Sequence, residues 1–302
     1  MNIDYDILRR FELGLDPQDL SQSAIPAQLL GYGEISAIFQ IEGLPGYAFK
    51  RMPLFTGPED AKQYEANYYE YCKALQQAGI VLPAHQTFMV ERPGGRTVLY
   101  IAQQAFNPGD FCHKRIHSAP LAEVEEMVAR IADRISALWA HNEQTRPGFE
   151  LALDGQISNW VISGDQLIFV DTSTPLFRKQ GVEQMDPELI LQSAPSFLRA
   201  VIRALFLSDV MNRYYDRRKV LIDLAANLFK EQQPQLVPPV LAILNARNPD
   251  LAPITEKELQ SYYREDKFIW WLFLNARRLD RWMTSRLLGK RYEFILPGKV
   301  RR

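Results

Sequence analysis

The spacing of apolar residues changes partway along the chain, and this change restricts the folds open to it more than any other feature. From about Leu29 to Phe106, apolar and polar residues alternate as they do in strands, with one helical segment among them. Beyond Pro120 the apolar residues recur every three or four positions, which is typical of amphipathic helices. The stretch Asn107-Pro108-Gly109-Asp110 between the two patterns has the chemistry of a turn. The chain therefore divides into a strand-rich first part and a helical second part.

From this division we predict an α+β protein with two lobes of unequal size. Residues 1–106 should form a small antiparallel sheet with one main helix, which starts near Pro58 and stops at Gly79. Residues 107–302 should form a larger, mostly helical lobe. Its expected helices span residues 121–142, 187–207, 213–229, 236–244, 255–264 and 268–288.

Composition and charge are those of an ordinary globular protein. Apolar residues make up 47% and charged residues 24% of the 302 positions. The formal net charge of −1 gives no overall field that would attract nucleic acid or an anionic membrane. The two cysteines form no disulfide framework, and no apolar run is long enough to cross a bilayer. We expect a soluble cytoplasmic protein without a membrane span and without a nucleic-acid partner.

A short hairpin in the second lobe is predicted to bring two oxygen-bearing side chains together. Its two strands are joined by Gly164-Asp165, which suits a two-residue turn. In that register Asn159 lies opposite Val170, so Asn159 and Asp171 should both emerge at the open end of the hairpin. Amide and carboxylate oxygens hold Mg²⁺ in phosphoryl transfer, and a further carboxylate such as Asp154 can orient the attacking hydroxyl. An ordinary polar loop around a hairpin is the alternative.

A glycine-containing turn and a lysine precede this hairpin in the first lobe. Gly31 and Gly33 permit positive φ and remove side chains where a backbone could approach phosphate oxygens. On the strand that follows, Lys50 shares one face with Ala48 and Met52 and could reach under the turn. The alternatives are a plain hairpin turn and an exposed lysine.

A buried lysine needs a carboxylate to fix its position, and the predicted main helix offers two. The apolar stripe of this helix runs through Tyr64 and Tyr68. Glu65 lies roughly 60° from the centre of that stripe, whereas Glu70 points almost directly away from it. We therefore predict that Glu65 holds Lys50 and that Glu70 faces water.

Taken in order, these segments resemble the protein-kinase-like superfamily, and more closely its branch of aminoglycoside phosphotransferases and small-molecule kinases. The resemblance runs from about Leu29 to Asp171. It implies a bilobed kinase-like fold and a transfer of the terminal phosphate of ATP, with Mg²⁺, to a hydroxyl group of a small molecule. The chemical identity of that molecule is not readable from the sequence.

The resemblance also assigns roles to individual residues. The implied catalytic residues are Asp154, Lys50 and Glu65. The implied nucleotide contacts, in the glycine-rich loop, the lysine strand and the hinge, are Gly31, Gly33, Ser36, Lys50, Gln104 and Phe106. The implied Mg²⁺ ligands are Asn159 and Asp171.

Three positions depart from the pattern of that superfamily. Ala152 stands where most members have a histidine, two residues before the catalytic aspartate. Gln156 stands where many have lysine or histidine, and a neutral amide stabilises phosphoryl charge less than a cation does. Thr172 follows Asp171 without the glycine of the protein-kinase motif. Two other functions therefore stay open: a pseudokinase that binds nucleotide as a regulatory module, and a nucleotidyl transferase acting on protein.

A basic stretch near the C-terminus stands apart from these motifs. Its members are Arg277, Arg278, Arg281, Arg286, Lys290 and Arg291. Such a stretch is usually a solvated helix face. Contact with a polyanionic partner is the alternative.

Overall fold

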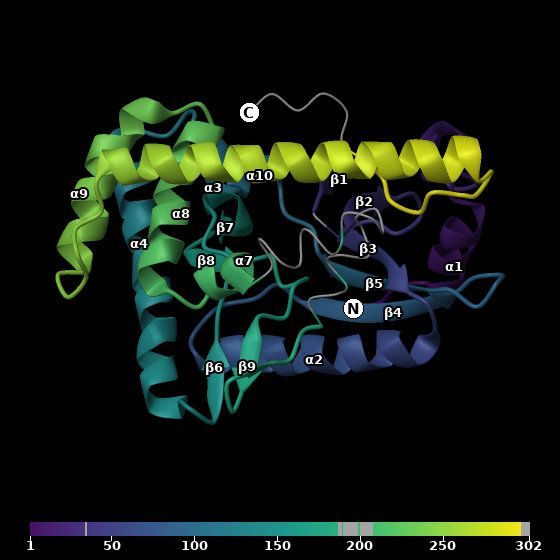
Figure 1. Cartoon of the computed structure of the whole chain (residues 1–302), viewed down its shortest axis with the longest axis horizontal. Helices are drawn as coiled ribbons and strands as arrows, with labels where there is room; N and C mark the ends of the chain where they lie inside the picture. The colour runs from purple at the N-terminus through teal and green to yellow at the C-terminus, as the bar shows by residue number, and fades with distance from the viewer. Residues whose placement is uncertain (34, 187–188, 190–198, 200–207, 297–302) are drawn as a thin grey trace.

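The computed structural model describes residues 1–33, 35–186, 189, 199 and 208–296. One half of the molecule holds an antiparallel sheet with helix α2 (Pro58–Gln77) beside it, and the other half is largely helical (Figure 1). The long helix α10 (Glu256–Trp282) runs across both halves. The prediction of an α+β protein with an antiparallel sheet is confirmed.

Among its described residues, the first half contains five strands, two α-helices and the short helical turn η1 (Leu20–Gln22). In chain order the strands and α-helices are α1 (Tyr5–Gly14), β1 (Ala27–Tyr32), β2 (Ala37–Ile41), β3 (Tyr47–Phe55), α2, β4 (His85–Glu91) and β5 (Thr97–Gln104). The strands pair antiparallel in the order β1-β2-β3-β5-β4, so β3 lies at the centre. Helix α2 starts with Pro58 in its first turn and is followed by Gly79 at φ +83°. Both of its predicted ends are therefore correct.

The second half contains most of the helices and two small sheets. Its helices and helical turns are η2 (Pro108–Asp110), α3 (Cys112–Arg115), α4 (Leu121–Thr145), η3 (Ile157–Asn159), α7 (Ser208–Arg213), α8 (Arg217–Lys230), η5 (Pro234–Leu236), α9 (Val237–Arg247), α10 and η6 (Met283–Leu287). Its strands are β6 (Phe149–Leu151), β7 (Trp160–Ser163), β8 (Gln166–Phe169), β9 (Phe177–Lys179) and β10 (Val182–Glu183). Strands β7 and β8 form a two-stranded hairpin, with single bridges from Ile168 to Val81 and from Val161 to Phe111, and β6, β9 and β10 form a separate sheet.

Three helices differ from the prediction. Helix α10 is continuous where two helices were expected, because Glu265, Asp266 and Lys267 all tolerate a helix interior and no glycine or proline separates the two segments. The expected helix over residues 213–229 begins instead at Arg217, where the Asp216 side chain caps α8. Helix α1 was not predicted. The helix expected over residues 187–207 lies outside the described residues apart from two positions.

The two faces of the sheet pack against different helices. On the α2 face, Met52 and Ile101 contact the tyrosines of α2 in one apolar cluster. On the opposite face, Phe39 and Phe49 pack against Phe11 of α1. Because successive residues of a strand point to opposite faces, the side chains of β3 are divided between these two clusters.

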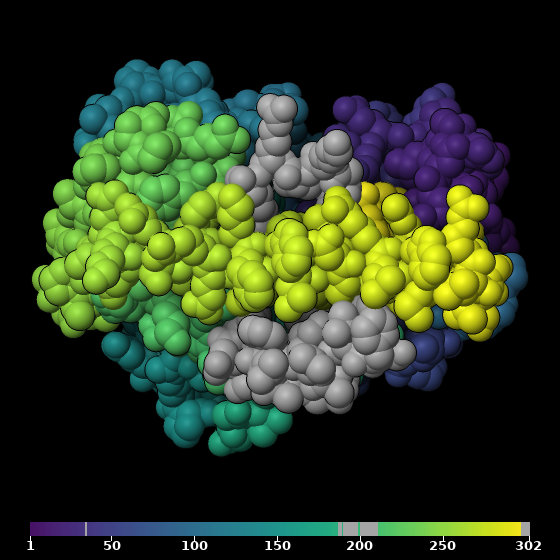
Figure 2. Space-filling view, turned by 45° about the horizontal axis from the view of Figure 1, so that its top comes forward, coloured from purple at the N-terminus to yellow at the C-terminus, as the bar shows by residue number. Residues whose placement is uncertain are grey.

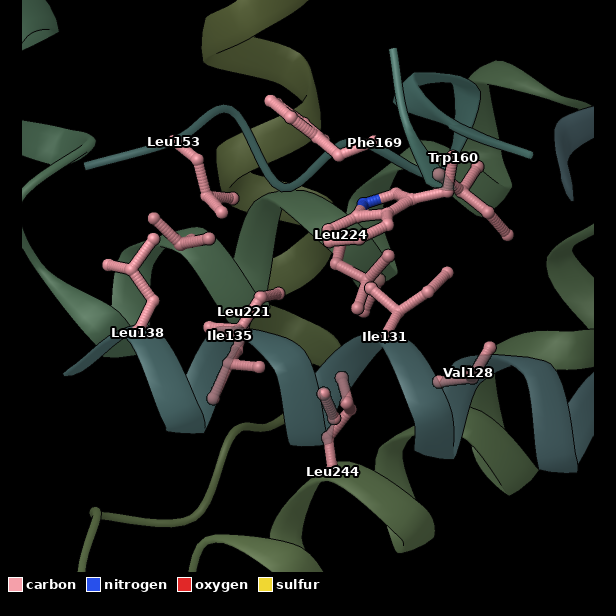
Figure 3. Packing of buried hydrophobic residues seen from close by; sticks show 14 of the residues in the cluster. Val128, Ile131, Ile135, Leu138, Leu153, Trp160, Phe169, Leu221, Leu224 and Leu244 are labelled. Atoms are coloured by element: carbon pink, nitrogen blue, oxygen red, sulfur yellow. The ribbon is translucent and has the colours of Figure 1, made fainter. Parts of the chain in front are cut away.

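The β7–β8 hairpin packs into the helical core. Trp160 and Phe169 are fully buried, with ring centroids 5.1 Å apart. They lie in the same cluster as Ile131 of α4 and Leu221 and Leu224 of α8 (Figure 3). An isolated two-stranded hairpin is only marginally stable in water, so these contacts hold it in place.

A buried charged cluster ties both ends of the chain to the sheet. The guanidinium of Arg51 in β3 donates to the carboxylate of Glu12 in α1, with Nε–Oε2 and Nη2–Oε1 distances of 2.6 and 2.8 Å. Arg92 and the hydroxyl of Tyr100 also donate to Glu12, and Arg51 reaches the carbonyl oxygen of Glu293 at 2.7 Å. Glu12 and Arg51 are 0% and 1% exposed. The cluster therefore depends on complete pairing.

The segment after α10 returns to the sheet because of this cluster. Glu293 supplies a second carboxylate to Arg51, with Nη2–Oε2 at 3.0 Å. Next to it, Phe294 packs on the α2-side cluster and Ile295 on the α1-side cluster. This differs from the predicted division, in which residues 107–302 all belong to the helical lobe.

Replacing Glu12 tests the buried cluster. Burial alone would raise the pKa of Glu12, but the Arg51 guanidinium and hydrogen bonds from Tyr100 and Arg92 lower this pKa to about 2. Glu12→Gln leaves Arg51 buried without its main partner, so we expect the free energy of unfolding at pH 7 to fall by roughly 3 kcal/mol in urea titrations. Since the folded-state pKa is depressed, the wild type should lose this advantage as the pH falls from about 4.5 towards 2.

The matched control for this experiment is Glu59→Gln, which removes an exposed partner of Lys62 and should leave the stability unchanged. Wild-type stability of Glu12→Gln at pH 7, or a stability difference that persists below pH 2, would contradict the assignment.

Candidate active site

An ion pair joins the sheet to the β7–β8 hairpin. The ammonium of Lys50 in β3 lies 2.9 Å from Asp171 Oδ1 and also donates to the carbonyl oxygen of Val170 at 2.9 Å. The Lys50 side chain is 7% exposed and that of Asp171 is 37% exposed. Lys50 is therefore a buried lysine with a fixed partner, and the alternative of an exposed lysine is excluded.

The hairpin has the register that the sequence predicted. Trp160 pairs with Phe169 and Ser163 with Gln166, and the turn glycine, Gly164, has φ +57°. Beyond the last strand pair, the Val170 N–H donates to the Asn159 carbonyl oxygen at 2.9 Å. Asn159 and the residue after Val170, which is Asp171, thus emerge at one end of the hairpin, as expected.

Asp171 is held in its charged form. Its burial would raise its pKa, but the Lys50 ammonium and the hydroxyl of Ser173, whose Oγ lies 2.8 Å from Oδ1, together lower the pKa below its usual value. A carboxylate that is ionised at neutral pH can bind a cation without first losing a proton. Both of these contacts use Oδ1, and the Asp171 side chain is partly exposed.

The loop between β6 and the hairpin folds around Asp154. The backbone N–H of Gln156 donates to Asp154 Oδ1 at 3.0 Å, and the Asn159 side-chain nitrogen donates to the Asp154 carbonyl oxygen at 3.2 Å. The second contact orients the amide of Asn159 through its nitrogen. Asp154, Asn159 and Asp171 are all partly exposed.

These residues fit a magnesium ion bound together with phosphate oxygens. Mg²⁺ is usually bound by one or two protein oxygens, completed by phosphates and water. Asn159 and Asp171 each carry an oxygen of this kind at the open end of the hairpin. Within the described part of the chain, no group of three or more His, Cys, Asp or Glu residues could form a metal cage by itself. The amide of Asn159 and the carboxylate of Asp171 are of the ligand types that suit Mg²⁺.

The prediction that Glu65 holds Lys50 is wrong. Glu65 accepts a hydrogen bond from Thr87 Oγ1 in β4. Thr87 and Lys50 both lie opposite Ile101 of β5, so one strand separates them and they are about 10 Å apart across the sheet. The helical-wheel argument found the correct side of α2 but could not show over which strand the helix lies. Glu70, expected to face water, is partly exposed and pairs with Lys179 at 2.7 Å.

Tyrosines of α2 contact the segments that carry the candidate site, a feature that the sequence analysis missed. Tyr64 donates to the Ser173 carbonyl oxygen, and Tyr71 donates to that of Ala152 at 2.8 Å. Between them, Tyr68 OH lies 3.4 Å from Thr172 Oγ1. Burial raises the pKa of all three hydroxyls, so they stay protonated and can donate. Three tyrosines spaced at helical intervals on the predicted inner face were the available signal.

The glycine-containing turn is built differently from the prediction. Gly31 lies within β1, beside a bulge, and neither Gly31 nor Gly33 has positive φ. Gly33 opens the turn, and its N–H donates to the Ser36 carbonyl oxygen at 2.9 Å. A Cβ on Gly33 would lie 2.7 Å from Ser36 Oγ, so close approach rather than backbone conformation explains this glycine. Ser36 is buried at the end of the turn.

The two residues expected at the hinge lie at the end of β5 and just beyond it. The N–H groups of Gln104 and Ala105 donate to the carbonyl oxygens of Ala84 and Gly46, each at 2.9 Å. These donors are thus used inside the protein. Gln104 is exposed and Phe106 is partly buried, so an adenine contact through these residues remains a prediction.

The ammonium of Lys230 contacts Gln156, where the sequence has a neutral side chain in place of a cation. Lys230, at the end of α8, donates to Gln156 Oε1 with a distance of 3.0 Å. Gln156 in turn lies beside Asp154, through its backbone N–H. No sequence pattern indicates this contact, because Lys230 follows Gln156 by 74 positions.

A double-mutant cycle tests the ion pair without any nucleotide. We expect Lys50→Met and Asp171→Asn to be coupled by about 1–2 kcal/mol in urea unfolding, discounted because the Asp171 side chain is 37% exposed. The exposed pair Lys62–Glu59 is the control and should give no measurable coupling. Additive effects of Lys50→Met and Asp171→Asn would show that the pair does not form in solution.

A comparison with protein-family models identifies the family of the chain. The model described as "Family of unknown function (DUF6206)" matches residues 18–281, and no curated protein matches the chain. The matched range includes Lys50, Asp154, Asn159 and Asp171, so the candidate site lies within the part of the chain that defines the family. The chain therefore belongs to the DUF6206 family, whose function is unknown.

Proposed function

We propose that this protein is an ATP-dependent phosphotransferase that passes the terminal phosphate to a hydroxyl group of a small molecule. The observation that carries the proposal is the contact between Lys50 of the sheet and Asp171 of the hairpin, with Asn159 beside it. Phosphoryl transfer needs a cation against the phosphates and oxygens that hold a metal at the same point. These groups come from segments 121 positions apart, so their meeting is a product of the fold.

The arrangement of the first half supports a bilobed kinase-like fold as part of this proposal. Its sheet has the order β1-β2-β3-β5-β4, and the single long helix α2 lies between β3 and β4 in sequence. The lysine is on the central strand β3, next to the turn between β1 and β2. A nucleotide under that turn would have its phosphates near Lys50.

The chain's own residues have separate roles in the proposed reaction. Lys50 gives up one of its present contacts and pairs with nucleotide phosphates, while Asp171 keeps it in place. Asp154 accepts a hydrogen bond from the acceptor hydroxyl and orients it for in-line attack. Asn159 and Asp171 would hold Mg²⁺, which neutralises charge on the phosphates when bound.

Lys230 supports the proposal at Gln156, the position where the sequence lacks the cation found in many members of the superfamily. The neutral side chain of Gln156 weakens the case for catalysis, since phosphoryl charge is best stabilised by a cation. With its ammonium 3.0 Å from Gln156, Lys230 brings positive charge to the same place from α8. A merely structural role, in which Lys230 balances the partial negative charge at the end of α8, is the competing explanation.

Two alternatives use the same site. A pseudokinase would bind Mg·ATP without turnover, and the absence of a cation at position 156 itself favours it. A nucleotidyl transferase would move the α-phosphate with its nucleoside. Incubation with α- or γ-labelled ATP separates all three, because label transfer follows the α-phosphate, the γ-phosphate or neither.

Two substitutions test the proposed roles of the carboxylates. Asp171→Asn should weaken Mg-dependent ATP binding at least about tenfold in calorimetry, because it removes the metal ligand. Asp154→Asn should bind ATP normally and lower the transfer rate by roughly 100-fold or more, because the hydroxyl is no longer oriented.

Asp165→Asn is the matched control, since Asp165 is an exposed carboxylate at the opposite end of the same hairpin. Transfer from γ-labelled ATP is assayed against a set of alcohols, sugars and nucleosides. Wild-type transfer by both Asp154→Asn and Asp171→Asn would refute the assignment.

Substitution of Lys230 separates a catalytic from a structural contribution. We expect Lys230→Gln to lower kcat by roughly 10- to 100-fold with a smaller effect on KM, because it removes charge from the transition state. Lys230→Arg should keep most of the activity. The control Lys219→Gln removes an exposed lysine from the other end of α8 and should change nothing. Equal loss of activity in Lys230→Gln and Lys230→Arg, together with a lower melting temperature, would indicate a structural role.

A further inference from the structure

Helix α10 and the turn after it present an apolar surface to solvent. The exposed apolar side chains, each between 43% and 63% exposed, are Phe268, Trp271, Leu279, Trp282, Leu287 and Leu288. The rings of Phe268 and Trp271 stack with centroids 6.2 Å apart. Figure 2 shows α10 as a continuous band along the surface of the molecule. Scattered exposed apolar residues are normal, but a row of this length along one helix is not.

The geometry of the helix places this row opposite its packed side. Leu259 and Arg277 are buried and lie 18 positions apart, which is five full turns, so they share one line on the helix. Phe268 lies nine positions from each of them, or two and a half turns, on the opposite side. The exposed row therefore lies on the side of α10 opposite Leu259 and Arg277.

Positive charge is concentrated around the same face. From Lys267 to Arg291 the chain has seven Lys and Arg residues and one acid, Asp280, which is a net charge of +6. Since the whole chain has a net charge of −1, the other residues together carry −7. Among the basic residues, Arg281 and Arg286 are exposed beside the apolar row. The segment 267–291 is therefore basic, although the net charge of the whole chain is slightly negative.

We propose that this face of α10 binds an anionic lipid surface, with the helix lying in the plane of the interface. Tryptophan and phenylalanine with flanking arginines are the composition of interfacial helices, whose apolar side enters the acyl boundary while cations meet anionic headgroups. In the described part of the chain, no helix is long and apolar enough to cross a bilayer. The contact is therefore peripheral. It does not depend on the function proposed above.

Charge and apolar character together favour this partner over two others. A second copy of the chain would bring two basic surfaces, each with the exposed Arg281 and Arg286, against each other, and like charges oppose such a contact. A nucleic acid would satisfy the arginines, but it offers no apolar phase for Leu279, Leu287 and Leu288. An anionic membrane satisfies both features.

Flotation with lipid vesicles tests the proposal on the full chain. We expect binding to vesicles of phosphatidylcholine with about 30% phosphatidylserine, weak binding to phosphatidylcholine alone, and loss of binding at high salt. Trp271→Ser with Trp282→Ser should weaken binding by roughly 100-fold, because two large apolar side chains no longer enter the lipid. Arg281→Gln with Arg286→Gln should weaken it by roughly tenfold or more.

Two matched controls keep the test specific to α10. Arg9→Gln with Arg10→Gln makes the same change in net charge with two exposed arginines of α1, and Val182→Ser removes an apolar side chain that is 63% exposed elsewhere. Both should bind vesicles like the wild type. Melting temperatures of all variants verify that they fold.

Tryptophan fluorescence gives an independent measurement. The chain has five tryptophans, of which Trp139 and Trp160 are buried and Trp271 and Trp282 are exposed. Their emission should shift to the blue on addition of the anionic vesicles. Three outcomes would overturn the proposal: no binding to anionic vesicles, a blue shift that depends on protein concentration without lipid, or oligonucleotide binding that needs the arginines but not the tryptophans.

Discussion

Two neighbouring cations on the central strand β3 constrain the rest of the structure. Lys50 and Arg51 are both buried, and because successive residues point to opposite faces of a sheet, each needs its own anionic partner on its own side. Lys50 finds Asp171, which brings the hairpin of the helical half to the sheet. Arg51 finds Glu12 and Glu293, which bring both ends of the chain to the other face. Lys50 and Arg51 thus link the sheet to the hairpin, to α1 and to the segment after α10.

The two ion pairs differ in a way that bears on function. Arg51 and Glu12 are closed off from solvent and surrounded by further donors, so their pairing serves the fold. The Lys50 pair is open on one side, since the Asp171 side chain is partly exposed. An ion pair that is half open, between two halves of a molecule, is suited to accept a charged ligand. This asymmetry is why the proposed function rests on Lys50.

The hairpin was predicted correctly from neighbouring residues along the chain, whereas the charged partners that come from distant segments were not. The register of Asn159 and Val170 follows from the turn at Gly164, and it was correct. The partner of Lys50 was assigned to Glu65 from the phase of a helix, and it was wrong, because the lateral position of α2 over the sheet is not encoded in that phase. Lys230 could not be found at all by sequence, since no local pattern links α8 to the loop around Asp154.

By itself, the sequence determined the class of the fold, the antiparallel sheet of the first half, most of the long helices, the hairpin and the identity of the polar residues at its open end. These follow from periodicity, turn chemistry and capping, which act over a few residues. The tertiary structure alone decided which charges meet: Lys50 with Asp171, Arg51 with Glu12 and Glu293, and Lys230 with Gln156. Those contacts depend on how whole elements pack. A buried charge needs a partner of opposite charge or a hydrogen bond, and the packing decides which residues lie close enough to provide it.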